Sequence, residues 1–240
     1  ECSYPCLGTE YSLPQGYSVE AIATDHAGTV YLLVKDQTTS YYYLQQHFTD
    51  GKWSDLELIT TDKDRSLTSL QVTSNQDIYA YTMSGYLMYY KKPKGGVWSP
   101  VQRNENINQC INGVFDSNNR FNCVVGPRND WAYTYNLLIY YPDGRVSTPV
   151  HIGDGNFINL EIIPGYHGEL HFLFASSGTI YYRQRDAAGK WSDLEAVTPT
   201  IAPSPGVYGP GIQGEVDAQN NVFVGYRQSN GQGANFLYRS

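Results

Sequence analysis

Long apolar segments are missing from this chain. No apolar run approaches the roughly 20 residues that a membrane-spanning helix needs, so we expect a soluble protein without a membrane partner. No stretch keeps a 3.6-residue apolar period over three turns, and helix should therefore be almost absent. Charged residues are also few, at 16%, and the formal net charge is −7. An acidic chain lacks the basic footprint that phosphate binding requires, which excludes nucleic acid as an expected partner.

Cysteine is scarce as well, and its spacing predicts disulfides rather than metal binding. Cys110 and Cys123 flank the turn at 116–119 almost symmetrically, so they should face each other on adjacent antiparallel strands. That placement permits a disulfide, and the alternative is two buried thiols that act as small apolar residues. We expect Cys2 and Cys6 to pair in a small N-terminal loop. The paired CxxC pattern of a zinc site is absent, so no metal is expected, and nothing indicates a cofactor.

A dipeptide that is Trp-Ser in three copies recurs in degraded form at intervals of 42, 45, 48 and 45 residues. A period in this range, filled with short alternating runs, is typical of solenoids and propellers. Glycine-containing turns such as Asp50-Gly51 precede the dipeptide and predict tight two-residue hairpins. The simplest role for a recurring indole is packing between neighbouring sheets, and the alternative is that all the recurring aromatic residues bind ligand. The copies are Tyr11-Ser12, Trp53-Ser54, Trp98-Ser99, Val146-Ser147 and Trp191-Ser192.

Each period contains four strand-like segments rich in aromatic and β-branched residues. In the first repeat they are 17–24, 29–34, 41–48 and a fourth that starts at Trp53. The last repeat ends after its third segment, whereas the chain begins with an isolated fourth-strand-like segment at 9–13. Pairing the two would complete a fifth blade and remove the exposed sheet edges.

The sequence therefore predicts an all-β fold, a single five-bladed β-propeller of four-stranded antiparallel blades whose ring is closed by the N-terminal strand. The expected blades are about 16–59, 64–103, 104–152, 156–198, and 208–240 plus 9–15.

The phrase Gly-Lys-Trp-Ser-Asp-Leu-Glu stands at 51–57 and again at 189–195, and Ile-Tyr-Tyr-Arg precedes the second copy. These repeats resemble the blades of tachylectin-type lectins and of fungal fucose-specific lectins. The resemblance implies a secreted carbohydrate-binding protein with pockets in or between its blades. Because the first residue is Glu1 rather than Met, we also expect a removed secretory signal and an extracellular location.

Fucose-type pockets need an arginine, a glutamate and an aromatic residue repeated in register, and this chain does not repeat them. Arg183, for example, corresponds to Lys91, Pro142 and Arg239 in other repeats. Irregular loops instead gather on one predicted face, at 126–133 and 198–209, which favours a single ligand site at the mouth of the channel. Aromatic rings there would stack on the ligand, and basic groups would orient its oxygens. The expected ligand-binding residues are Lys35, Arg128, Asp130, Trp131, Tyr133, Tyr208 and Arg227.

Polar residues interrupt the first strand of every repeat, which lines the central channel of a propeller. A hydrated tunnel explains them, and a ligand pocket is the alternative. Two of Glu20, Glu161 and Glu215 could form the acid and base of a glycosidase, whose carboxyl groups lie about 5 to 9.5 Å apart. No histidine has a Ser or Cys partner at a diagnostic spacing, so nucleophilic catalysis has no support. The residues in question are Glu20, Gln71, Asn112, Glu161, Gln213 and Glu215.

These observations predict a secreted, lectin-like propeller that binds a carbohydrate or another small molecule. Two further possibilities stay open. One is a single-pocket enzyme on a lectin-like propeller, either a glycoside hydrolase or a cyclase or isomerase of the natural-product type, in which positioning supplies much of the rate. The other is a structural or protein-interaction module.

Overall fold

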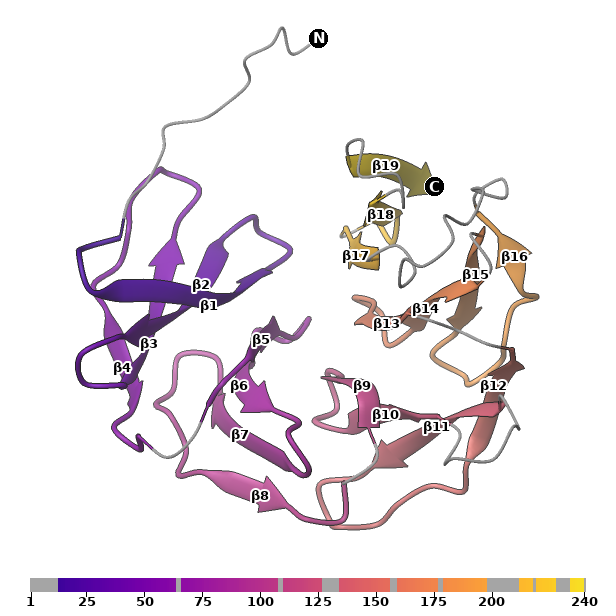
Figure 1. Cartoon of the computed structure of the whole chain (residues 1–240), viewed down its shortest axis with the longest axis horizontal. Helices are drawn as coiled ribbons and strands as arrows, with labels where there is room; N and C mark the ends of the chain where they lie inside the picture. Colours follow the sequence, from indigo (N-terminus) through magenta and orange to yellow (C-terminus); the bar gives the residue numbers. More distant parts are fainter. Residues whose placement is uncertain are drawn as a thin grey trace, which may run out of the picture.

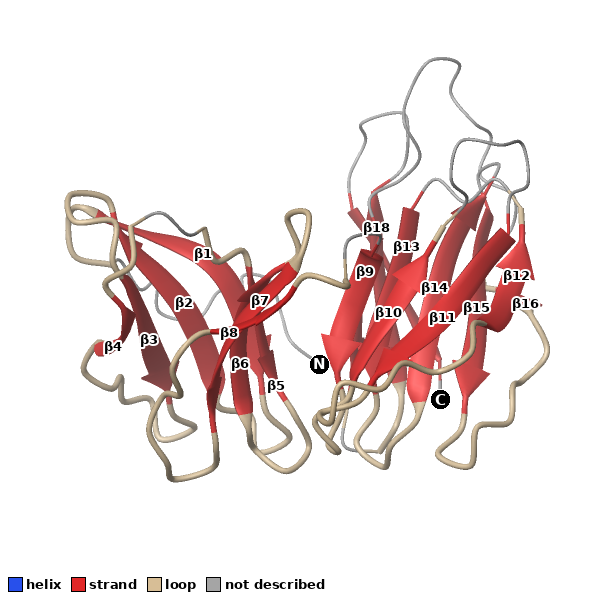
Figure 2. Ribbon diagram, turned by 90° about the horizontal axis from the view of Figure 1, so that it is seen from below, coloured by secondary structure: helices blue, strands red, loops and turns tan. Residues whose placement is uncertain are grey.

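The chain forms five antiparallel sheets arranged around a central channel (Figure 1), and the strands of each sheet run between two end faces (Figure 2). The computed structural model describes residues 13–63, 66–107, 110–126, 134–155, 159–176, 179–197, 212–217, 219–227 and 234–239. For residues 159, 226, 227 and 234–239 it describes the backbone alone. Within these ranges the structure contains no helix long and apolar enough to cross a membrane.

Four of the sheets are complete four-stranded blades, paired in chain order from the inner strand outward. Blade 1 consists of β1 (Tyr17–Thr24), β2 (Val30–Asp36), β3 (Tyr42–His47) and β4 (Glu57–Thr60). Blade 2 consists of β5 (Ser69–Val72), β6 (Ile78–Thr82), β7 (Leu87–Lys92) and β8 (Gln102–Asn104). Blade 3 consists of β9 (Cys110–Phe115), β10 (Phe121–Val125), β11 (Thr134–Tyr140) and β12 (Val150–Asp154). Blade 4 consists of β13 (Asn159–Pro164), β14 (Leu170–Ser176), β15 (Thr179–Arg185) and β16 (Glu195–Ala196).

The fifth sheet contains three described strands, β17 (Ile212–Val216), β18 (Val222–Arg227) and β19 (Ala234–Arg239). In Figure 1 no described strand bridges the opening between this sheet and blade 1. The predicted all-β propeller with four-stranded blades is therefore confirmed, whereas closure of its ring is not shown. Residues 9–12 of the predicted closing strand lie outside the described residues.

The hydrophobic core is divided into four clusters, one at each interface between consecutive sheets. Successive side chains on a strand point to opposite faces, so each blade supplies residues to two interfaces. Trp98 packs against the cluster between blades 1 and 2, and Trp191 packs against the cluster between blades 3 and 4. The predicted packing role is confirmed for these two indoles.

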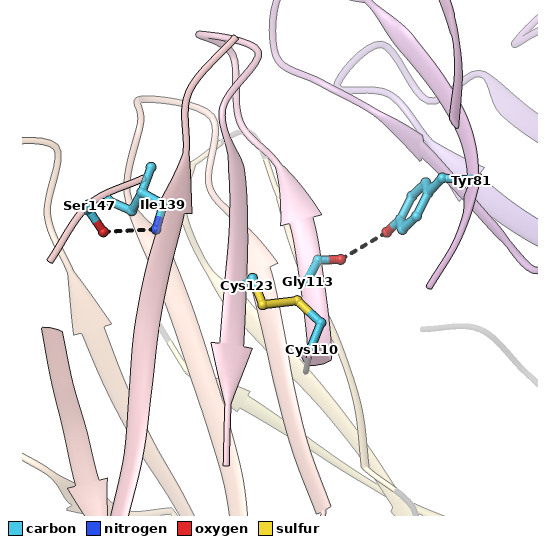
Figure 3. The surroundings of a disulfide bond; sticks show 6 residues. All are labelled: Tyr81, Cys110, Gly113, Cys123, Ile139 and Ser147. Atoms are coloured by element: carbon cyan, nitrogen blue, oxygen red, sulfur yellow. Dashed lines mark hydrogen bonds between the residues drawn. A yellow bond between two sulfur atoms is a disulfide. The ribbon is translucent and has the colours of Figure 1, made fainter. Parts of the chain in front are cut away.

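The repeated serine forms hydrogen bonds with the third strand of its blade, at the bulge that precedes the outer strand. The Ser147 hydroxyl accepts a hydrogen bond from the Ile139 N–H at 3.0 Å (Figure 3). The Ser147 N–H donates to the Ile139 carbonyl at 2.9 Å. Ser54, Ser99 and Ser192 accept from the equivalent amides at 2.9, 3.1 and 2.9 Å. One side-chain oxygen thus takes the place of a strand carbonyl in four blades.

This bulge corrects the predicted start of the outer strand. Trp53 forms an isolated bridge to His47, and β4 begins four residues later, at Glu57. The hairpin before it is also longer than predicted. Gly51 donates to the Phe48 carbonyl and has a φ of 84°, which is the geometry of a three-residue loop with a glycine bulge.

The turn between the first two strands of each sheet carries a second repeat, which was not predicted from the sequence. Its first residue is an aspartate in three sheets, and the carboxylate accepts backbone N–H groups two and four residues later. In blade 4 that position is Gly165, where a Cβ atom would lie 2.4 Å from Cγ of Glu169. The Glu169 carboxylate accepts the His167 N–H at 2.8 Å and so replaces the missing aspartate. The three aspartates are Asp25, Asp116 and Asp217.

Candidate functional site

The five inner strands surround a channel cavity of about 760 Å³. Its lining includes all six polar residues that interrupt the first strands, which confirms that prediction from the sequence. A volume in this range is typical of small-molecule sites. The six are Glu20, Gln71, Asn112, Glu161, Gln213 and Glu215.

Two of these residues connect neighbouring inner strands. The Gln71 amide binds the backbone of Phe115 in both directions, accepting its N–H at 2.8 Å and donating to its carbonyl. The Asn112 amide donates to the Leu160 carbonyl at 3.1 Å, which joins β9 to β13. Because the inner strands of different blades form no ladder with one another, these amides satisfy backbone groups at the channel wall. Gln71 and Asn112 therefore have structural roles.

The carboxylates of Glu161 and Glu215 form the electrostatic centre of the channel. They lie on β13 and β17, the packed inner strands of blade 4 and the fifth sheet. The pKa of Glu161 is raised to about 7, mainly by burial; the hydrogen bond from the Gly214 N–H lowers it in part, and the nearby Glu215 charge adds to the rise. Burial also raises the pKa of Glu215, although its side chain is open to the channel on one side. The Glu161 carboxyl therefore keeps its proton to a higher pH than an ordinary glutamate does.

Glu20 has a different environment, on β1 of blade 1. Its side chain is exposed, and its carboxylate accepts a hydrogen bond from the Ser18 hydroxyl at 2.7 Å. Of the three carboxylates considered for acid and base catalysis, Glu215 is the one whose charge raises the pKa of Glu161.

Aromatic rings from opposite sides meet at the end of the channel that carries the first-to-second strand turns. His26 of blade 1 and Tyr166 of blade 4 have ring centroids 6.0 Å apart at an interplanar angle of 74°. Burial raises the pKa of the Tyr166 hydroxyl, and the charges of Glu215 and Asp25 raise it further. This end of the channel is thus partly covered and negative in potential, which favours neutral or cationic ligands over anions.

The predicted mouth lies mostly on residues whose placement is not described. Lys35 pairs with Tyr42 near the end of β2, and its ammonium lies 5.5 Å from the centroid of the Tyr42 ring. The backbone of Arg227 ends β18, the corresponding strand of the fifth sheet. The structure therefore leaves a joint binding role for this set as a prediction. The remaining members, Arg128, Asp130, Trp131, Tyr133 and Tyr208, lie outside the described residues.

A disulfide joins Cys110 on β9 to Cys123 on β10, with the Cα atoms 5.5 Å apart (Figure 3). Cys123 is fully buried, and the nearby Gly113 carbonyl accepts the Tyr81 hydroxyl of blade 2 at 3.1 Å. The pairing expected from the symmetric spacing about the turn is confirmed. The other predicted pair, Cys2 and Cys6, falls on residues that the structure does not describe.

A second, smaller cavity of about 180 Å³ lies between blades 2 and 3, where no site was predicted. Its walls include Tyr89 and Asn104 of blade 2 and Phe121 and Tyr140 of blade 3. The sequence contained a signal for it, because the blade 3 copy of the repeated dipeptide has Val146 in place of tryptophan. Among the described side chains, no group of three or more His, Cys, Asp and Glu residues is placed to hold a metal ion.

Comparisons with known proteins support the fold alone. No protein-family model and no curated protein matches the chain. A protein of unknown function from Bacteroides caccae is similar in structure, with a TM-score of 0.53 and 10% identity over 92% of this chain and 75% of that one.

Two further structures are more distant, each with a TM-score of 0.45. One is YCF48 bound to a D1 peptide, with 14% identity over 92% of this chain and 66% of its own length. The other is a quinonprotein alcohol dehydrogenase-like protein from Bacteroides thetaiotaomicron, with 13% identity over 97% and 65%. The chain thus spans slightly less than two thirds of the length of these two proteins.

Proposed function

We propose that this protein is a secreted, lectin-like propeller that binds a neutral carbohydrate in its central channel. The observation that carries the proposal is the channel cavity of about 760 Å³, lined by polar side chains from all five inner strands. Sugars present many hydroxyl groups, which can donate to a carboxylate and accept from a protonated carboxyl. The partly protonated Glu161 beside Glu215 provides both kinds of partner at neutral pH.

The charges in and around the cavity favour a sugar without acidic groups. Glu20, Glu161 and Glu215 line it, and Asp25 raises the pKa of the Tyr166 hydroxyl at one end. An anionic ligand would have to overcome this potential. The predicted aromatic and basic residues of the mouth, Trp131, Tyr208 and Arg128 among them, would add stacking surface and hydrogen-bond donors. The Cys110–Cys123 disulfide supports an oxidising compartment, in keeping with secretion.

Glycan-array screening followed by titration calorimetry tests this proposal. We expect one neutral sugar class to bind with one site per chain, and the Glu161→Gln and Glu215→Gln variants to weaken binding about tenfold or more. Glu195→Gln is the matched control, because Glu195 is exposed on the outer strand β16 of the same blade. Several equal sites, preference for acidic glycans, or normal binding by both channel variants would contradict the proposal.

A glycoside hydrolase is the second candidate, and the paired carboxyl groups favour it. Glycosidases use one carboxyl group with a raised pKa as general acid and a second carboxylate as base or nucleophile. Burial and the charge of Glu215 raise the pKa of Glu161 to about 7, which suits a proton donor at neutral pH. In this role Glu161 would protonate the leaving oxygen, and Glu215 would assist the attack at the sugar carbon.

Hydrolysis of aryl glycosides distinguishes the two candidates. An enzyme should release the phenol with a rate that falls as pH rises through about 7, because Glu161 loses its proton there. Glu161→Gln should lower kcat about 100-fold or more, whereas Glu195→Gln should leave it unchanged. Binding without turnover over a full day would leave the lectin proposal and eliminate the hydrolase.

A further inference from the structure

Two of the described interfaces between blades share a packing feature that the interface between blades 2 and 3 lacks. Trp98 and Trp191 hold equivalent positions before the outer strand of their blade, and each packs against the cluster shared with the preceding blade. In blade 3 the equivalent residue is Val146, since Val146 bridges Tyr140 as Trp191 bridges Arg185. Val146 is 45% exposed and does not fill the space that an indole fills elsewhere.

The cavity of about 180 Å³ lies at this interface and is lined by the positions that receive the indole in the other blades. Leu87 and Tyr89 of β7 line it, and their equivalents in blade 3, Tyr135 and Leu137, belong to the cluster on which Trp191 packs. Their equivalents in blade 1 belong likewise to the cluster on which Trp98 packs. Each water occupies about 30 Å³ in the liquid, so the recess has room for roughly six waters. A small ring system needs about the same volume.

The blade 2 side of the recess differs from the other two interfaces in polarity. Five residues after the repeated serine, blades 1 and 3 have Ile59 and Ile152, which are 7% and 0% exposed beneath the indoles. The equivalent residue in blade 2 is Asn104, which lines the recess together with Gln102. Asn104 accepts the Asn106 N–H in the turn after β8 at 3.1 Å, and its amide adds a hydrogen-bonding group to a recess that loss of an indole alone would leave apolar.

Aromatic rings form the inner wall of the recess. Phe115 lies 4.9 Å from both Tyr89 and Phe121, measured between ring centroids, and Tyr140 lies beside them in the same lining. Such a wall offers flat apolar surface and ring edges to a planar guest. At the rim, the Asn104 Oδ1 accepts the Asn106 N–H at 3.1 Å and the Gln102 Nε2 donates to the Pro100 carbonyl at 3.3 Å, so the Asn104 amide nitrogen and the Gln102 Oε1 are the groups proposed for a guest.

We propose that this recess between blades 2 and 3 is a binding site for a single planar aromatic ring that carries a hydrogen-bonding substituent. The guest takes the place that an indole side chain holds in the two neighbouring interfaces. Its ring packs against Phe121, Tyr89 and Tyr140, and its polar group binds Asn104. This site is separate from the channel and does not depend on the function proposed for the channel.

Fluorine NMR with 5-fluoroindole tests the site on the full-length chain. The ¹⁹F signal should broaden on addition of wild-type protein, and ligand NOEs should connect it to the Tyr89 and Phe121 rings. Val146→Trp should abolish both effects, because the new indole fills the recess. Val97→Trp is the matched control, since Val97 is 82% exposed in the corresponding hairpin of blade 2, and it should bind as wild type does.

A second variant separates the polar contact from the ring contact. Asn104→Ile restores the residue found in blades 1 and 3, and it should weaken 5-fluoroindole about fivefold, the effect of losing one neutral hydrogen bond. If Val146→Trp fails to fold, the NOEs between 5-fluoroindole and the wild-type protein test the site by themselves. The proposal is overturned if fluoroindole does not bind, if its NOEs lead to channel residues, if Val146→Trp still binds it, or if only methyl glycosides occupy the recess.

Discussion

Single buried carboxylates hold the tight turns of this molecule. Asp116 is 4% exposed and accepts the N–H groups of Asn118 and Arg120 at 2.9 and 3.0 Å. Its second oxygen accepts the Arg120 guanidinium at 2.7 Å and the Asn122 amide at 3.2 Å. Removing this group leaves several buried donors without a partner, which costs far more than losing a solvated contact.

Asp116→Ala should therefore lower the free energy of unfolding by about 2 to 4 kcal/mol in urea denaturation. The matched control is Asp143→Ala, which removes an exposed aspartate that also binds a nearby arginine, Arg145, at 2.7 Å. Water and salt replace that contact, so little change is expected. Equal losses in the two variants would contradict the structural role assigned to Asp116.

Glu161 should make stability depend on pH. Its pKa is about 7 in the folded protein and ordinary, near 4.5, in the unfolded chain. The unfolded state therefore loses its proton first, and the contribution of this group to stability, complete below about pH 4.5, is lost as pH rises through about 7.

Glu161→Gln removes this dependence and should stabilise the protein by about 1 to 3 kcal/mol at pH 8, with little change at pH 4.5. Urea denaturation of both proteins at the two pH values measures the difference. A stabilisation of the same size at both pH values would show that packing, rather than ionisation, is responsible.

At the scale of the strand and hairpin, the repeated serine explains why the dipeptide recurs even where its tryptophan is lost. Ser192 accepts the Gln184 N–H at 2.9 Å and donates its own N–H to the Gln184 carbonyl at 2.9 Å. Ser192→Ala should cost about 1 kcal/mol and accelerate hydrogen exchange at the Gln184 amide, whereas Ser192→Thr keeps the hydroxyl and should do neither. Unchanged exchange at Gln184 in the alanine variant would contradict this account.

The inner three strands of each repeat could be read from alternation and turn residues, because those patterns depend on local geometry. The outer strand could not, since β4 starts after a bulge that depends on the hydroxyl of Ser54 rather than on apolar spacing. The sequence also could not predict that Glu169 supplies the carboxylate missing at Gly165. This replacement preserves a carboxylate in space while moving it four residues along the chain.

At the scale of the whole molecule, the sequence predicted the channel lining correctly because inner strands must face the axis of a propeller. It did not predict which lining groups interact. The raised pKa of Glu161 comes from burial and from Glu215, a residue 54 positions later whose proximity only the packing of β13 against β17 creates. The recess between blades 2 and 3 was not predicted for the same reason. Val146 and Asn104 belong to different blades, and only the packing of these blades places both residues at one interface.

Two exposed apolar residues indicate how the ring would close. Ile22 is 61% exposed, whereas Leu70, its equivalent in blade 2, is 8% exposed beneath blade 1. Phe223 is 43% exposed, whereas its equivalent Tyr79 is 1% exposed beneath blade 3. Both residues line the channel cavity on the faces of blade 1 and the fifth sheet that no described sheet covers, and packing of these two faces in a closed ring would bury them.

Aspartate at either position therefore distinguishes the two arrangements. In a closed ring Ile22→Asp and Phe223→Asp each place a charge in an apolar interface and should cost about 3 kcal/mol or more, measured by urea denaturation. In an open array both changes fall on solvated surface and should cost little. Leu194→Asp is the control, because Leu194 is 47% exposed beside the outer strand β16. It should leave the free energy of unfolding nearly unchanged in both arrangements. Wild-type stability in both aspartate variants would refute closure by this pair of faces.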